Sequence, residues 1–213
     1  MAVAIKICGI STVEALDAAI DARADFIGLV FFPPSPRFVD GHAASALAMR
    51  AGSRIGRIGL FVDADDSLIG EAIKTGRLDG VQLHGEETPE RVAQVKSRFG
   101  LPVWKAIPVS SAKDILVANE YREAADLLLF DAKTPKDAAL PGGMGLRFDW
   151  SLLEGWKGRH GWGLAGGLSP TNVTEALAQT RAPLLDTSSG VETAPGEKDP
   201  ALIKAFCEAA RRA

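Results

Sequence analysis

Cys8 and Asp131 each end a short apolar segment with a side chain that can exchange a proton. Cys8 closes segment 3–8 and is followed at once by Gly9, and Asp131 closes the Leu-Leu-Leu-Phe-Asp run at 127–131. A thiolate can accept a proton, and a carboxyl group can donate one. A base and an acid that face one cavity could move a proton between two substrate atoms. The structural alternatives are a small buried side chain for Cys8 and a carboxylate that caps loop amides for Asp131.

The neighbours of Cys8 in the sequence favour the thiolate. Because side chains alternate along a strand, Lys6 and Cys8 share one face, and Ile5 and Ile7 share the other. A nearby cation and the N-terminus of the helix expected next would both lower the pKa of a thiol. We therefore expect Cys8 to face the inside of the fold and to be more reactive than Cys207, which lies in the last predicted helix.

Two glycine-containing segments could bind an anion. Gly166 and Gly167 follow the seventh predicted strand, and Ser188 and Ser189 follow the eighth, which ends at Asp186. Glycines allow a ligand to approach the backbone closely, and amides at a helix N-terminus attract negative charge. Loops after the seventh and eighth strands are a recurrent phosphate site in eight-stranded barrels. The sequence therefore predicts a phosphorylated small molecule as ligand.

Arg37 follows three prolines in the segment Pro33-Pro34-Ser35-Pro36-Arg37. An arginine in a stiff loop can bind a carboxylate through two hydrogen bonds, with a solvated arginine as the alternative. His84 ends the fourth predicted strand, and we interpret it as a polar strand-end residue rather than a catalyst. The three histidines are far apart and show no zinc-ligand spacing, so we expect no metal.

Strand-like and helix-like segments alternate along the whole chain. The strands are predicted at 3–8, 25–31, 57–62, 80–83, 103–107, 126–131, 163–165 and 184–186. Short apolar segments of this kind are typical of parallel strands covered by helices. Eight units over 213 residues give about 27 residues each, near the roughly 30 of a strand–helix unit. We predict a single-domain (β/α)8 barrel, or TIM barrel, over 1–213, with an open doubly wound sheet as the alternative.

Several helices carry start signals. Ser11 and Glu14 have the spacing of a capping box ahead of the first helix. Three later helices are expected to begin at a proline after a cap residue, namely Thr88, Ser169 and Asp199. The stretches 132–147 and 190–198 are expected to be loops at the carboxyl ends of the strands, where barrel sites lie.

The composition excludes several classes of protein. The chain has 24 Lys and Arg against 27 Asp and Glu, a net charge of −3, which argues against nucleic-acid or anionic-membrane binding. Its apolar runs are far shorter than the roughly 18 residues of a membrane span, and its N-terminus lacks a signal-peptide pattern. Two cysteines are not a disulfide framework. We expect a cytoplasmic protein that is a monomer or a homodimer.

In order along the chain, these motifs resemble the phosphoribosylanthranilate isomerases of tryptophan biosynthesis. The resemblance covers essentially the whole chain and is carried by KICGI at 6–10, FFPPSPR at 31–37, VQLHG at 81–85, LFD at 129–131, GGMG at 142–145, FDW at 148–150, LAGGL at 164–168 and SSGVE at 188–192. It implies a (β/α)8 barrel that uses neither a metal nor an organic cofactor. The implied reaction is the Amadori rearrangement of N-(5-phosphoribosyl)anthranilate to 1-(2-carboxyphenylamino)-1-deoxyribulose 5-phosphate.

The resemblance also implies roles for the candidate residues. Asp131 corresponds to the general acid that protonates the ribose ring oxygen and opens the ring. Cys8 corresponds to the general base that removes the proton from the second ribose carbon. Arg37 corresponds to the residue that holds the anthranilate carboxylate. The phosphate would lie against the backbone at Gly166, Gly167, Ser188 and Ser189, and Asp186 lies where a substrate hydroxyl could bind.

The chain departs from the family pattern at three places. Arg147 stands where the family often has lysine, Met144 stands where small residues are common, and the loop 132–141 is unusual. We expect these differences to affect loop closure and turnover rate, not the type of reaction. Two alternatives stay open: the related histidine-pathway isomerase, which uses an aspartate where Cys8 stands, and a non-catalytic barrel that binds a phosphorylated metabolite.

Overall fold

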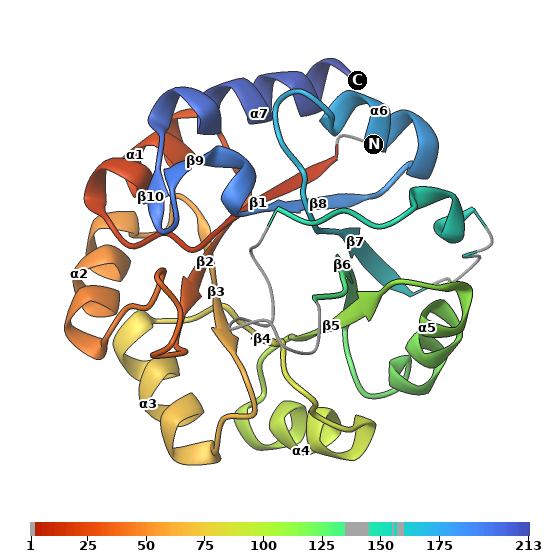
Figure 1. The fold of residues 1–213 in the computed structure, drawn as a ribbon. Coiled ribbons are helices and arrows are strands. Elements are labelled where there is room, and N and C mark those ends of the chain that lie inside the picture. Colours follow the sequence, from red (N-terminus) through yellow and green to blue (C-terminus); the bar gives the residue numbers. More distant parts are fainter. Residues whose placement is uncertain (1–2, 135–144, 155, 157–159) are drawn as a thin grey trace.

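Eight parallel strands form a closed barrel in the computed structural model, which describes residues 3–134, 145–154, 156 and 160–213. Neighbouring strands follow chain order, and β8 (Leu184–Thr187) closes the barrel by pairing with β1 (Ala4–Cys8). The helices form a ring outside the strands (Figure 1). The predicted (β/α)8 barrel is confirmed, and the alternative of an open doubly wound sheet is wrong.

The other barrel strands occur where the sequence predicts them. They are β2 (Phe26–Val30), β3 (Gly56–Phe61), β4 (Gly80–Leu83), β5 (Val103–Val109), β6 (Leu127–Ala132) and β7 (Gly161–Leu164). The predicted ends are wrong by one or two residues at several places. For example, Asp25 and Asp126 precede β2 and β6, and their carboxylates accept hydrogen bonds from the amides of Ile5 and Val103 at the start of neighbouring strands.

The helices that cover the barrel are α1 (Val13–Asp21), α2 (Gly41–Ala51), α3 (Asp66–Gly76), α4 (Pro89–Phe99), α5 (Ala112–Val117), α6 (Val173–Thr180) and α7 (Pro200–Arg212). Short 3-10 helices occur at η1 (Ala118–Tyr121), η2 (Trp150–Leu153) and η3 (Ser189–Val191). Between β6 and β7, the part of the chain that the structure describes contains only η2.

Two of the predicted helix starts are confirmed and two are wrong. Thr88 and Asp199 cap α4 and α7 with their side chains, ahead of a proline. In α1, however, the Thr12 hydroxyl, not that of Ser11, accepts a hydrogen bond from the Ala15 amide. The predicted start at Ser169 is wrong because residues 169–172 form a separate turn, and α6 begins at Val173.

The two faces of the strands bury different kinds of side chain. Ile5 and Ile7 belong to the large apolar cluster that includes residues of the surrounding helices, as predicted. Inside the barrel, an apolar layer around Trp104 and Leu129 fills the amino-terminal end. Cys8 belongs to a separate small cluster with Val30 and Leu60. The barrel is therefore a packed core whose polar interior groups lie toward the carboxyl ends of the strands.

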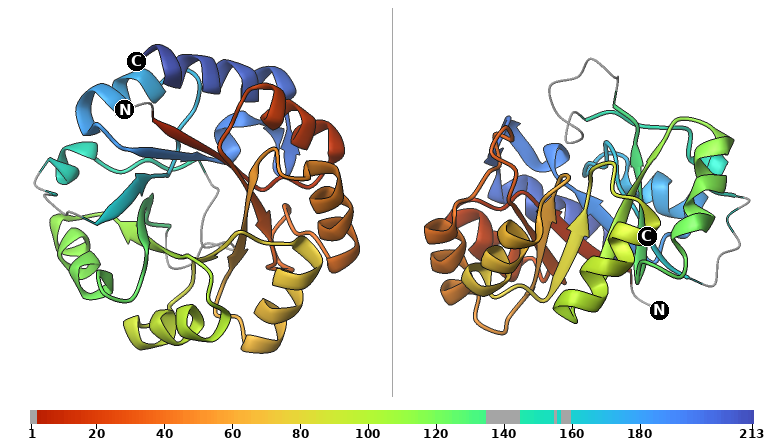
Figure 2. Two further views of the ribbon diagram at one scale, coloured as in Figure 1. Left: turned by 180° about the vertical axis from the view of Figure 1, so that it is seen from behind. Right: turned by 90° about the horizontal axis from the view of Figure 1, so that it is seen from below.

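The segment 190–198 is more regular than predicted. It forms a small hairpin of β9 (Glu192–Ala194) and β10 (Glu197–Lys198), which follows η3. The hairpin lies on the α1 side of the barrel in Figure 1, and Figure 2 gives two further views. Over the described residues, no helix is both long and apolar enough to cross a membrane.

Candidate active site

One pocket contains every residue that the sequence analysis selected as catalytic or substrate-binding. Its lining includes Cys8, Arg37, Asp131, Gly166, Gly167, Asp186, Ser188 and Ser189. These residues come from the carboxyl ends of strands β1, β6 and β8 and from the loops after β2, β7 and β8. The pocket therefore lies at the end of the barrel where (β/α)8 enzymes carry their active sites.

Cys8 lies beside a buried ion pair. Lys6 is completely buried, and its Nζ atom donates a 2.8 Å hydrogen bond to Oδ2 of Asp186 on β8. Gly28 on β2 makes room for this arrangement, because a Cβ atom there would lie 2.8 Å from the Cys8 sulfur and 3.1 Å from Lys6 Nζ. The other oxygen of Asp186, Oδ1, is buried and has no hydrogen-bond partner among the described residues.

The predicted activation of the Cys8 thiol is wrong for the free protein. Burial raises the pKa of the Cys8 thiol, and the nearby positive charge of Lys6 offsets this effect only in part. Burial would lower the pKa of Lys6, but the Asp186 and Cys8 side chains together raise it above its ordinary value. Lys6 is therefore held as a cation next to a thiol that is mostly protonated at neutral pH.

His84 contacts Asp131, a relationship that the sequence analysis missed. His84 follows β4, and its Nε2 atom lies 3.2 Å from Oδ2 of Asp131 at the end of β6. Its Nδ1 atom lies 3.1 Å from the side-chain amide nitrogen of Gln82, which can only donate. In the tautomer with a proton on Nε2, Nδ1 accepts a hydrogen bond from Gln82 and Nε2–H donates one to Asp131. Oδ1 of Asp131 accepts from the Ala132 amide at 2.8 Å. The interpretation of His84 as a polar strand-end residue stays a prediction, to which the structure adds the contact with Asp131.

Arg37 is buried and paired, so the alternative of a solvated loop arginine is wrong. Its side chain donates two hydrogen bonds to the Glu192 carboxylate, from Nε at 2.8 Å and from Nη2 at 2.7 Å. Lys198 also pairs with Glu192, and its Nζ donates to the backbone oxygen of Ser188 at 3.1 Å. Although burial alone would raise the pKa of Glu192, Arg37 and Lys198 together lower it. The loop after β2 is thus tied to the hairpin after β8.

The glycine-containing loops have backbone conformations that require glycine. Gly166 and Gly167 have φ values of +81° and +63°, in the left-handed region. A Cβ atom at Gly166 would lie 2.5 Å from the Ala132 nitrogen, and one at Gly167 would lie 2.4 Å from a side-chain carbon of Arg147. The loop after β7 therefore packs tightly against the end of β6 and against residues 145–147.

Of the three places where the sequence departs from the family pattern, the structure describes Arg147 but not Met144, and it describes only the first residues of the loop 132–141. Arg147 lies within the described residues, with its guanidinium 5.6 Å from the centre of the Trp150 ring. It also lines a second pocket, which adjoins the first through Arg37, Gly167 and Ser189. Met144 and most of the loop 132–141 lie outside the described residues.

A closed (β/α)8 barrel that brings a carboxyl group, a thiol and two glycine-containing loops to one pocket has the architecture of a barrel enzyme. A family model for N-(5'phosphoribosyl)anthranilate (PRA) isomerase matches residues 5–209. The N-(5'-phosphoribosyl)anthranilate isomerase of Paramagnetospirillum magneticum is 52% identical over 211 residues, covering 99% of this chain and 98% of the relative. The chain belongs to the N-(5'-phosphoribosyl)anthranilate isomerase family.

Solved structures of this family have the same fold. The crystal structure of phosphoribosyl anthranilate isomerase from Thermotoga maritima matches with a TM-score of 0.89 at 36% identity, covering 99% of this chain and all (100%) of that one. Another phosphoribosyl anthranilate isomerase was solved in complex with reduced 1-(o-carboxyphenylamino)-1-deoxyribulose 5-phosphate. It matches with a TM-score of 0.86 at 34% identity, with 99% and 100% coverage.

Proposed function

We propose that this chain catalyses the rearrangement of N-(5-phosphoribosyl)anthranilate to 1-(2-carboxyphenylamino)-1-deoxyribulose 5-phosphate, a step of tryptophan biosynthesis, with Asp131 as general acid and Cys8 as general base. The observation that carries these roles is that both side chains line one pocket, together with Arg37 and the loops after β7 and β8. Two proton-exchanging groups, one carboxylate-binding group and one phosphate-binding surface match the parts of this substrate.

Asp131 would open the ribose ring by protonating the ring oxygen, which leaves a protonated Schiff base between the sugar and the anthranilate nitrogen. Asp131 becomes a carboxylate in this step. The Nε2–H of His84 points at Oδ2 of Asp131, so its hydrogen bond strengthens as negative charge develops there. This arrangement favours the transition state over the resting state, which is the requirement for a group that contributes to rate.

Cys8 would then remove the proton from the second ribose carbon and give the enolamine, which becomes the ketone when its hydroxyl proton moves to the first carbon. The Cys8 thiolate needed for this step is disfavoured by burial, and Lys6 supplies the opposing positive charge. One turnover leaves Asp131 without its proton and Cys8 with an extra one. Exchange with solvent restores both groups, so the net reaction is an isomerisation.

The remaining groups would hold the substrate. Arg37 would take the anthranilate carboxylate, and the backbone at Gly166, Gly167, Ser188 and Ser189 would hold the phosphate. Asp186 Oδ1 is a buried acceptor without a partner among the described residues, so a substrate hydroxyl could donate to it. Burial raises the pKa of Asp186 above its ordinary value, and the ion pair with Lys6 offsets part of this effect.

The decisive experiment follows the loss of phosphoribosylanthranilate fluorescence with the purified protein. We expect turnover of this substrate and little or none of the histidine-pathway aminoaldose. Turnover of only the latter would support the histidine-pathway alternative, and tight binding of product analogues without turnover would support a non-catalytic barrel.

An assay with excess EDTA tests the sequence-based prediction that no metal is needed. The predicted cytoplasmic location and a monomeric or homodimeric state stay predictions, and light scattering tests the latter.

A further inference from the structure

We propose that the buried ion pair between Glu87 and Lys105 positions His84 against Asp131 and so sets the rate of the acid step. This inference rests on the proposed role of Asp131. Glu87 lies in the turn after β4, and Lys105 lies on the neighbouring strand β5. Their side chains are 3% exposed, and Lys105 Nζ lies 3.0 Å from Glu87 Oε2. Neither residue lines the pocket, so neither is placed to touch substrate.

Lys105 binds the backbone on both sides of His84. Its Nζ atom donates to the carbonyl oxygen of Gly85 at 2.8 Å and, more weakly, to that of Leu83 at 3.5 Å. These are the residues directly before and after His84 in the chain. One buried ammonium group therefore holds the peptide group before His84, through Leu83, and the peptide group that follows Gly85.

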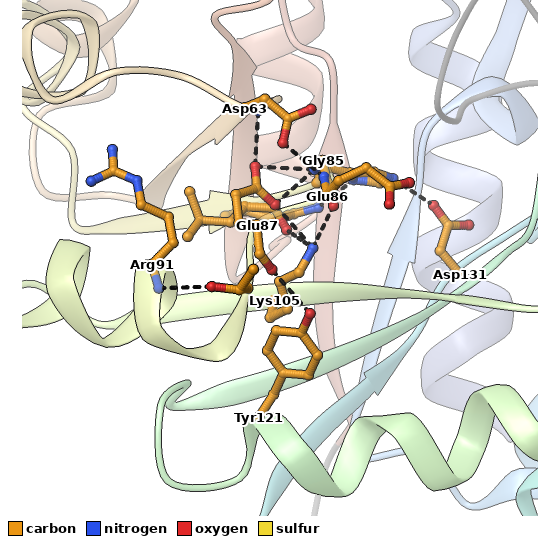
Figure 3. Close-up of polar contacts among 12 residues, drawn as sticks. Asp63, Gly85, Glu86, Glu87, Arg91, Lys105, Tyr121 and Asp131 are labelled. Atoms are coloured by element: carbon orange, nitrogen blue, oxygen red, sulfur yellow. Dashed lines mark hydrogen bonds and ion pairs between the residues drawn. The ribbon is translucent and has the colours of Figure 1, made fainter.

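Glu87 fixes the same turn from its other side. Both of its carboxylate oxygens accept from the Gly85 amide, at 3.1 and 2.9 Å, and Oε1 also accepts from the amide of Asp63 at 3.0 Å. Asp63 in turn accepts from the Glu86 amide at 2.8 Å. A side chain at position 85 would collide with Asp63, because a Cβ atom there would lie 2.4 Å from Oδ1. Figure 3 shows these contacts converging between Asp63 and Lys105.

The network extends outward to the helical layer. The Tyr121 hydroxyl donates to the backbone oxygen of Glu87 at 3.0 Å, and Lys105 Nζ lies 5.8 Å from the centre of the Tyr121 ring. In Figure 3, Asp131 lies at the far edge of the network from Arg91. The chain of contacts thus runs from η1, through the ion pair and the turn after β4, to the carboxyl group of the acid.

A buried ion pair is weak evidence for stability, because removing two charges from water costs about as much as their attraction returns. Strands β4 and β5 already pair through their backbones, so the Glu87–Lys105 ion pair is not needed to hold them together. Its presence at this place needs another reason. The charged hydrogen bonds of this pair hold three successive peptide groups of the turn, from Leu83 to Glu86, and these include the two that flank His84. This is the arrangement expected of outer residues that orient a functional side chain.

The test uses three variants, Glu87→Gln, Lys105→Met and the double variant with both changes. Each single change leaves one buried charge unpaired, which can prevent folding. The double variant has no unpaired charge, so it can be assayed even if a single variant does not fold. The matched control is Asp79→Asn, which removes the negative charge from the Arg57–Asp79 ion pair at the opposite end of the barrel.

We expect the double variant to fold and to lose about 10- to 100-fold in kcat with KM changed less than about threefold, since a misplacement of about 1 Å can cost about 100-fold. The Asp79→Asn control should keep its kcat. A kcat in the double variant within about twofold of wild type would show that the pair only balances charge, and would overturn the inference.

The second readout does not depend on activity. In the ring ¹H–¹⁵N spectrum, the Nε2–H signal of His84 should shift or broaden in the double variant, while His42 and His160 stay unchanged. An unchanged His84 signal would overturn the positioning role. If Asp131→Asn proved active, the proposed function of Asp131 would fail instead, and the ring signal would still report whether Glu87 and Lys105 position His84.

Discussion

Arg37 and Glu192 are 155 residues apart in the chain, yet their side chains meet through two parallel hydrogen bonds of 2.8 and 2.7 Å. The pair is almost completely buried, with 6% and 4% of the two side chains exposed. It joins the proline-rich loop after β2 to the hairpin after β8 across the rim of the pocket. Arg37 therefore has two possible contributions, binding the substrate carboxylate and tying two loops together, and the two can be separated.

We predict that Arg37→Ala weakens binding of product analogues that carry the anthranilate carboxylate. Losing a charge-assisted contact should cost about 1.5–3 kcal/mol of binding free energy. Calorimetric titration of wild type and variant gives the number, with an analogue that lacks the carboxylate as the control. Equal losses for both analogues, reproduced by Glu192→Gln, would mean that Arg37 acts only by tying the loops together.

Asp131→Asn should abolish most turnover while the protein stays folded, because the amide keeps the shape of the side chain and removes the titratable proton. General acids contribute about 10²- to 10⁴-fold to rate, so kcat should fall within that range. Circular dichroism checks the fold, and the fluorescence assay gives kcat. Activity within about threefold of wild type would refute the assignment of Asp131 as the acid.

Cys8 should react with iodoacetamide before Cys207, although both thiols are buried. Cys8 lines the pocket. Cys207 is a residue of α7 whose side chain lies in the apolar core, and burial raises its pKa to about 11. Because burial also raises the pKa of Cys8, we expect its labelling rate to be low at pH 7 and to climb steadily into the alkaline range. Peptide mapping identifies the modified residue, and a bound product analogue should slow the reaction.

Labelling at Cys8 should abolish turnover, and Cys8→Ser should be severely impaired because a serine hydroxyl is a far weaker base. The proposed role of Cys8 cannot stand if Cys207 is labelled first or if Cys8→Ser turns over near the wild-type rate.

Gly28→Ala should impair turnover more than it impairs folding. The added methyl group would lie 2.8 Å from the Cys8 sulfur and 3.1 Å from Lys6 Nζ, so both groups must move. We expect kcat/KM to fall by at least about tenfold, since small displacements of reacting groups are costly. Gly70→Ala on α3 is the matched control, because a Cβ atom there would make only an ordinary 3.4 Å contact with Phe99. Equal kcat/KM values for the two variants would contradict this expectation.

Asp114 belongs to the capping box at the start of α5, in which Ser111 is the N-cap residue. Asp114→Asn should lower the free energy of unfolding by about 1 kcal/mol at pH 7, the usual contribution of a helix cap. Burial alone would raise the pKa of Asp114, but hydrogen bonds from Ser110 and Ser111 lower it from 3.8 to about 2. A carboxyl group whose pKa is lower in the folded than in the unfolded protein stabilises the fold at any pH above its unfolded pKa. This stabilisation is lost as the pH falls through its folded pKa. Urea denaturation should therefore show the gap between wild type and variant narrowing from about pH 4 toward pH 2, and a gap independent of pH would contradict the assignment.

The sequence by itself determined the strands, most of the helices and the candidate residues of the pocket. Short apolar segments, caps such as Thr88 and Asp199, and glycines such as Gly167 are local signals, because their physical causes act within a few residues. The order of eight similar units then left few topologies to choose from. Given a barrel, residues at the carboxyl ends of strands must face one cavity, which is why Cys8, Asp131 and Asp186 could be grouped without coordinates.

Only the tertiary structure decided how those residues interact. His84 at the end of β4 and Asp131 at the end of β6 are not on neighbouring strands, and no local pattern tells a paired strand-end histidine from a solvated one. A histidine at the carboxyl end of a barrel strand was the one available signal. The sequence predicted a lowered pKa for Cys8, whereas the structure gives a raised one. The charge of Lys6 can be read from the sequence, but the burial of the Cys8 side chain cannot. Burial and contacts between distant segments depend on how the whole chain closes into the barrel, so they arise only when it has folded.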